Sequence, residues 1–145
     1  MRQRGFTLLE VLVALVIMSI GLIGLVGLML TSAKNNQSAY QRSQASWIAY
    51  DIIDSMRANR VLAQSGAYNV PLGTAATGSG MAVSDVTQWK RELSNAFPSG
   101  DGSVLVQNGV ATVTVRWNDS RGLSTLNAGG FSGNAGQIIT VQALL

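Results

Sequence analysis

The residues best suited to do chemistry lie within the first ten positions, in the segment 4–10 (RGFTLLE). Glu10 places a carboxylate directly before a long apolar run, and a charge there is costly in lipid, so we treat it as a candidate functional residue. A carboxylate buried among apolar helices needs a cationic partner. The alternative is an interfacial role, in which the side chain of Glu10 reaches the lipid headgroups.

The rest of the chain offers little catalytic chemistry. It has no His and no Cys, which removes disulfides, thiolate metal sites, cysteine nucleophiles and the commonest neutral-pH general base. The Gly-rich segment 74–80 lacks the Lys of a phosphate-binding loop. Asp54 and Arg57 are spaced as a surface ion pair on a helix, and Asp51 fits a solvated face or an intersubunit patch. We predict that the protein is not an enzyme and has no cofactor or metal, with Asp101 and Asp119 as the only loop candidates for metal ligands.

A long helix must position Glu10. The twenty residues Val11–Leu30 carry no charge and would form roughly 30 Å of helix, enough to cross a bilayer core. Arg2 and Arg4 precede this run, so the positive-inside rule predicts a cytoplasmic N-terminus and places residues 31 onward across the membrane. A cleaved secretory signal peptide and a simple signal anchor are the alternatives, and neither explains Glu10.

The helix is predicted to continue to about residue 60. Its second half carries a stripe that we expect to face the core of a globular domain, made of Ala33, Tyr40 and Trp47 with Ile48, Ile52 and Met56 on a neighbouring line. Three glycines, at positions 21, 24 and 27, recur within the apolar half. They indicate either close packing against another helix or a weak point at which the helix can stretch.

The sequence after the long helix predicts a small α+β domain. Segment 61–80 reads as a loop, followed by a short helix capped by Ser84 or Asp85 and ending near residue 96. Segments 104–107 and 110–117, joined by Asn108-Gly109, predict a β-hairpin with a type I′ turn. A third strand is expected over 137–144, after a long surface loop over 118–136. The expected core positions of the short helix are Val86, Trp89, Leu93 and Ala96.

The N-terminal segment 4–11 (RGFTLLEV) resembles the class III signal of type IV prepilins and type II secretion pseudopilins. The resemblance implies that prepilin peptidase cuts between Gly5 and Phe6 and that Phe6 is then N-methylated. It implies that Glu10 pairs with the N-terminal amine of an adjoining subunit, supplied by Phe6 or by another pilin. The implied organisation is a leader (1–5), a transmembrane and filament-core helix (6–30) and a periplasmic globular domain (31–145). In that domain, 31–60 continues the helix and 61–145 holds a loop, a short helix and an antiparallel sheet, giving a type IV pilin-like fold.

Two further segments, 36–45 (NQSAYQRSQA) and 49–60 (AYDIIDSMRANR), are similar to the PilV family of minor pilins, the type IV pilus modification proteins. This implies a minor pilin of the tip or initiation complex that primes pilus assembly, with roles in twitching motility and adhesion. The implied partners are prepilin peptidase, other minor pilins, the major pilin, the inner-membrane assembly platform and a possible tip adhesin. The implied location is the inner membrane and then the pilus. The alternative is a minor pseudopilin of a type II secretion system.

The basic balance of the chain comes mainly from its leader. Ten Lys and Arg stand against seven Asp and Glu, a net charge of +3. Removing Arg2 and Arg4 leaves eight positive and seven negative side chains, or +1. The remaining cations form no stripe, since Lys90 and Arg91 adjoin Glu92. A DNA-capturing competence pilin is therefore disfavoured, and no nucleic-acid partner is expected.

Overall fold

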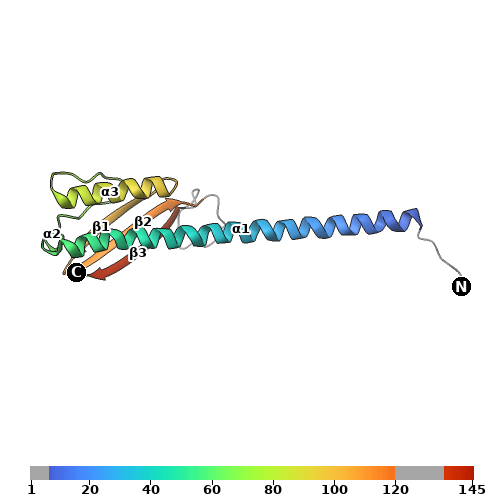
Figure 1. Ribbon diagram of the computed structural model, residues 1–145, viewed down its shortest axis with the longest axis horizontal. Helices are drawn as coiled ribbons and strands as arrows, with labels where there is room; N and C mark the ends of the chain where they lie inside the picture. Colours follow the sequence, from blue (N-terminus) through green and yellow to red (C-terminus); the bar gives the residue numbers. More distant parts are fainter. Residues whose placement is uncertain (1–6, 120–135) are drawn as a thin grey trace.

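A computed structural model describes residues 7–119 and 136–145. One helix projects far beyond a small head in which the remaining elements gather (Figure 1). In chain order the elements are α1 (Leu8–Ala58), α2 (Arg60–Gln64), α3 (Met81–Ala96), β1 (Asp101–Gln107), β2 (Val110–Asn118) and β3 (Gly136–Leu144). The predicted α+β class, a long N-terminal helix on a small antiparallel sheet, is confirmed, and it agrees with a type IV pilin-like fold.

Several predicted features lie outside the described residues. They are the leader 1–5 with Arg2 and Arg4, the Gly5–Phe6 cleavage site and nearly all of the surface loop predicted over 118–136.

Helix α1 has 51 residues, or about 77 Å at 1.5 Å per residue. Thr7 is its N-cap, and Asn59 ends it with φ −117° and ψ 46°, so the helix stops two residues before the predicted end at Arg60. The two hydroxyls in its apolar half bond within the helix, from Ser19 to the Leu15 carbonyl at 2.7 Å and from Thr31 to the Gly27 carbonyl at 3.0 Å. These bonds leave neither hydroxyl unsatisfied in an apolar medium. By length and composition α1 can cross a membrane.

The three strands form one antiparallel sheet in the order β1-β2-β3. Asn108 and Gly109 have φ values of 51° and 75°, which are the left-handed conformations that the predicted type I′ turn requires. Strand β1 begins at Asp101, earlier than predicted, so Asp101 is a strand residue and the prediction of a loop there was wrong. The prediction of a loop over 61–80 was also wrong in part. Most of α2 lies in this segment, and Val70 forms a single β-bridge with Val104 of β1.

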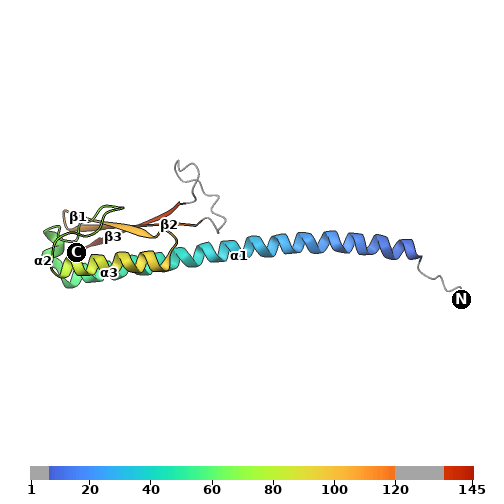
Figure 2. The ribbon, with the colours of Figure 1, turned by 90° about the horizontal axis from the view of Figure 1, so that it is seen from above.

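The helices cover one face of the sheet (Figure 2). Helix α1 packs against β2 and β3, and α3 packs against β1 and α1. Alternate residues of β2 point into the core, as a strand period of two requires. The second half of α1 forms the other wall, as predicted, and its buried apolar residues are Ala45, Ile48, Ala49, Ile52, Ile53 and Met56.

The predicted core role of Tyr40 and Trp47 is wrong. Their exposed fractions are 60% and 67%, and Ala33 is exposed as well. At about 100° per residue, this line of residues lies roughly 150–170° around α1 from the centre of its buried face. The spacing of seven marks a real stripe, but the head buries a different side of the helix, so these aromatic side chains lie outside the core.

Helix α3 buries the stripe predicted for it, with Val86, Trp89 and Leu93 inside and Ala96 half-buried. The indole N–H of Trp89 donates to the Ile48 carbonyl at 2.9 Å and ties α3 to α1. A Cβ on Gly102 would lie 2.3 Å from Cη2 of Trp89, which explains a glycine in β1 at this point.

The cap predicted for α3 is wrong, because the helix begins at Met81 with Gly80 as its N-cap. The φ of Gly80, 109°, allows the turn that starts the helix earlier. The carboxylate of Asp85 instead accepts a hydrogen bond of 2.6 Å from the hydroxyl of Tyr68. Burial, together with this bond to a carboxylate, raises the pKa of Tyr68.

Candidate functional site

Glu10 lies in the first turn of α1, close to the Thr7 N-cap. Its backbone N–H donates to Oγ1 of Thr7 at 3.3 Å. The spacing Thr7-x-x-Glu10 is that of a capping box, a signal readable in the sequence that the analysis above missed. A carboxylate in the first turn also interacts favourably with the helix dipole, by about 0.3–1 kcal/mol. The local sequence therefore starts the helix and holds Glu10 at its N-terminal end.

The carboxylate of Glu10 is the only charged side chain in α1 before Lys34. Within residues 7–119 and 136–145, no side chain donates to it. It therefore stands at the end of an apolar helix with its acceptor oxygens available to a cation from another molecule. This arrangement suits an intermolecular ion pair and offers no partner for acid–base catalysis.

The apolar half of α1 lies outside the core. Seventeen large apolar side chains from Leu8 to Leu30 are each at least 49% exposed. Exposed apolar surface on this scale marks a membrane or protein contact. A Cβ added at Gly21, Gly24 or Gly27 would meet no atom of another described element within 4 Å. Another helix could therefore approach closely at these three positions. The helix is continuous through all three glycines.

A polar junction joins α1 to the ends of β2 and β3 nearest the apolar half of the helix. The hydroxyl of Ser38 donates to Oδ2 of Asp119 at 2.6 Å, and Asp119 is only 1% exposed. The other carboxylate oxygen of Asp119, Oδ1, is buried and accepts no hydrogen bond from residues 7–119 and 136–145. The junction is completed by two bonds, from the Trp117 indole to Gln41 at 3.1 Å and from Arg42 to Gln137 at 2.9 Å.

From the sequence, Asp119 is predicted only as a candidate metal ligand in a loop. The structure places it in a different setting, bonded to a helix residue 81 positions earlier. No local pattern could have revealed this contact, because it depends on how α1 lies across the sheet. In residues 7–119 and 136–145 no three metal-ligating side chains come together.

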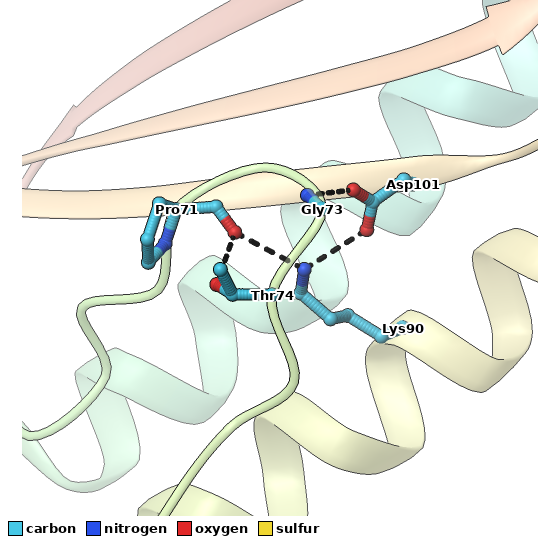
Figure 3. Close-up of polar contacts among 5 residues, drawn as sticks. All are labelled: Pro71, Gly73, Thr74, Lys90 and Asp101. Carbon is cyan, nitrogen blue, oxygen red and sulfur yellow. Dashed lines mark hydrogen bonds and ion pairs between the residues drawn. The ribbon is translucent and has the colours of Figure 1, made fainter.

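Asp101, the other metal candidate, is bonded to groups from two other segments (Figure 3). The ammonium of Lys90 lies 2.9 Å from Oδ1 of Asp101 and also donates to the Pro71 carbonyl at 3.3 Å. The backbone N–H of Gly73 donates to Oδ2 of Asp101. Burial alone would raise the pKa of Asp101, but the Lys90 ammonium and the N–H groups of Gly73 and Gly102 outweigh it and lower that pKa. This cluster fastens the loop around Pro71 to α3 and β1.

The pKa of Asp101 predicts a specific loss of stability in acid. Because the folded pKa lies below the usual 3.8, ionised Asp101 stabilises the fold above that value, and the stabilisation disappears as pH falls through the folded pKa. We expect Asp101→Asn to have a lower urea midpoint of unfolding than the wild type at pH 7. Below about pH 4, the difference between the two midpoints should become smaller. Asp54→Asn is the control, since the Asp54 side chain is 69% exposed in its pair with Arg57. A constant difference between Asp101→Asn and wild type from pH 7 to pH 3 would contradict the assignment.

The exposed pair of Asp54 and Arg57 forms as predicted, with its atoms 3.0 Å apart. Asp51 is also exposed, as predicted. Asp54 and Arg57 lie on the open surface, and Asp51 lines an open groove with Glu92. The described charged groups thus serve surface and structural contacts.

Comparison with known proteins bears on the N-terminal segment. Residues 1–26 match the family model of the prokaryotic N-terminal methylation motif. This motif is typical of the N-terminus of type IV prepilin-like proteins, and the match is confined to the first half of the long helix and the segment before it. No curated protein and no solved structure gives a significant match to the chain.

Proposed function

We propose that this chain, which carries a prepilin-like N-terminal methylation motif, is a minor pilin of a type IV pilus. In this proposal it enters the tip or initiation complex, primes assembly of the major pilin and contributes to twitching motility and adhesion. It contacts other minor pilins, the major pilin and the inner-membrane assembly platform, and it can present a tip adhesin.

The observation that carries the proposal is the form of α1. Its first half is apolar, exposed and continuous, with one carboxylate at its N-terminal end. Its second half is built into the core of the head. A helix of this kind is suited to lie first in lipid and then among the same halves of other subunits. Among the described residues, those of the head offer no comparable apolar surface for assembly.

The proposed processing follows from the motif. Prepilin peptidase removes residues 1–5 by cutting between Gly5 and Phe6, and Phe6 is methylated at its new amine. Before the cut, Arg2 and Arg4 hold the N-terminus on the cytoplasmic side and the head becomes periplasmic. In the filament, Glu10 pairs with the amine of Phe6 of a neighbouring subunit or of another pilin, which sets the axial register.

Assignment as a minor pilin of the PilV type is supported by the sequence of α1 beyond the apolar half. Segments 36–45 and 49–60 resemble that family. Segment 36–45 and residues 49–58 lie on the second half of α1, which packs on the sheet and α3. Residues there determine the fit between helix and head, so resemblance in this region bears on the type of head and not only on the anchor.

Mass spectrometry of the mature N-terminus tests the processing. We expect a chain that starts at N-methylated Phe6 in cells with prepilin peptidase and at Met1 in cells without it. The second strain is the control, because it separates peptidase cleavage from general proteolysis. A mature chain with Met1 intact in the peptidase-positive strain would refute the prepilin assignment.

The phenotype of a strain lacking this chain distinguishes a role in the pilus from a role in type II secretion. We expect a strain lacking this chain to lose most surface pili and twitching while type II secretion continues, and the full-length chain supplied in trans to restore pili. Loss of secretion with normal pili would instead support the minor pseudopilin and overturn the pilus assignment.

A further inference from the structure

A groove with a volume of about 420 Å³ lies between α1 and α3. The two helices run side by side there, with α3 against the second half of α1 (Figures 1 and 2). Gln44, Trp47 and Asp51 of α1 face Glu92 and Asn95 of α3 across it. An aromatic ring, two carboxylates and two amides therefore line one open site.

Trp47 is the unusual member of this site. The chain has three tryptophans, and the other two, Trp89 and Trp117, are 3% and 1% exposed, whereas Trp47 is 67% exposed. Each buried indole donates a hydrogen bond, to the Ile48 carbonyl and to Gln41 respectively. Trp47 makes no such bond with any residue that the structure describes, and its ring is available to another molecule.

The position of Trp47 argues against the membrane as the occupant of the groove. Trp47 lies seventeen residues after Leu30, about 25 Å further along the helix. The headgroup layer on each side of a bilayer is only about 5–7 Å thick. Trp47 therefore stands well above the lipid surface when the apolar half of α1 spans it, which favours a protein over lipid as the occupant of the groove.

The charge of the groove indicates the chemistry of that partner. Asp51 and Glu92 are both exposed, and neither belongs to an ion pair with any described residue. Glu92 lies near the C-terminal end of α3, where the helix dipole is negative and favours cations, yet the last turn of α3 has no basic residue. A cation from outside would offset all three sources of negative potential.

We propose that this groove binds an arginine side chain presented by a different subunit of the same filament; the identity of that subunit rests on the proposed function. The planar guanidinium stacks on the ring of Trp47 and donates hydrogen bonds to Asp51 and Glu92. A two-fold contact between copies of this chain is excluded at this groove, because it would place two anionic grooves against each other.

Titration of the full-length chain in detergent tests the site directly. The probe is Nα-acetyl-arginine amide, and its neutral control is the matching citrulline compound. The indole N–H signals in a ¹⁵N-resolved NMR spectrum give one reporter in the groove, Trp47, and two in the core. We expect the arginine compound to shift the Trp47 signal saturably and the citrulline compound to shift it at least five-fold less. Equal shifts, or none with either compound, would overturn the proposal.

Substitutions in the groove test whether its two carboxylates bind the arginine, as distinct from a general effect on folding. The double variant Asp51→Asn/Glu92→Gln is expected to weaken arginine binding at least five-fold, with the Trp89 and Trp117 signals unmoved as a check on folding. Asp54→Asn is the matched control, since it removes a carboxylate from the same helix outside the groove. Unchanged binding in the double variant, or equal loss in Asp54→Asn, would contradict the assignment.

Photocrosslinking in cells tests the partner. Benzoylphenylalanine in place of Gln44 is expected to give an adduct with an arginine-containing peptide of another pilin-like protein. That adduct should disappear with Asp51→Arg/Glu92→Arg and return when the partner's arginine is changed to glutamate. Adducts only with lipid or only with copies of this chain would overturn the proposal.

The two proposals fail in different ways. If the titration fails while the mature chain starts at methylated Phe6, the groove assignment is wrong and the pilin assignment stands. If the titration succeeds while Met1 is retained, the groove binds arginine but its partner is not a filament subunit.

Discussion

Replacement of Glu10 by alanine is expected to leave leader removal intact and to reduce incorporation into filaments by at least 100-fold. Glu10 is the only charged side chain in the apolar half of α1. In the proposed pairing between subunits, the loss of Glu10 leaves the positive amine of a neighbouring subunit without its partner. Removing one partner of a buried ion pair costs roughly 3–5 kcal/mol, and every 1.4 kcal/mol is a factor of ten. Immunoblots of sheared filaments against whole cells measure the ratio.

Two matched variants make this result specific. Ser19→Ala alters another polar side chain of the same apolar run, but its hydroxyl bonds only to the Leu15 carbonyl of its own helix, so near-normal incorporation is expected. Glu10→Asp keeps the charge but shortens its reach, so an intermediate loss is expected. Normal incorporation of Glu10→Ala would show that Glu10 acts only as a helix cap and would remove its assembly role.

Ser38→Ala is expected to destabilise the head by about 2–3 kcal/mol, a large effect for the loss of one hydroxyl. Asp119 is 1% exposed, and Ser38 supplies its single hydrogen bond among the described residues. Removing the donor leaves a buried carboxylate with no described partner. Leaving a buried polar group without a hydrogen bond destabilises the fold by about 1–3 kcal/mol, and the penalty is larger for a charged group than for a neutral one. Urea unfolding of the full-length chain in detergent, followed by near-ultraviolet circular dichroism, measures the change.

The double variant Ser38→Ala/Asp119→Leu is the decisive comparison. Replacing both partners by apolar groups removes the buried charge together with its donor, so the double variant should be more stable than Ser38→Ala alone. Ser43→Ala is the surface control, because that hydroxyl is exposed and bonds only to the Ala39 carbonyl; a change within about 0.5 kcal/mol is expected. If Ser38→Ala behaves like Ser43→Ala, the polar junction does not stabilise the head.

Local patterns in this chain predicted its elements well. The charge-free run before Lys34, the Asn108-Gly109 turn and the alternation along β2 each report a property of neighbouring residues. Every described helix and strand except α2 lies within a few residues of its predicted bounds. The main error concerned Tyr40 and Trp47. A spacing of seven shows that residues share a face of a helix, but it does not show which face the head will cover.

The candidate site was predictable only in part, for the same reason. Glu10 could be identified because its significance lies in its immediate sequence. The bond from Ser38 to Asp119 and the pairing of Lys90 with Asp101 join different elements, so they depend on packing. The groove around Trp47 exists only because α3 lies along α1. Such contacts leave no mark in any short segment of the sequence.

The continuity of α1 fixes the rotational phase of the head relative to the anchor. One unbroken helix carries both Glu10 and the core residue Met56, with no hinge between them. Each residue added or removed between the two halves would turn the head by about 100° and shift it by 1.5 Å. The number of residues between Glu10 and Met56 therefore sets the direction in which the Trp47 groove faces relative to the anchor half of α1.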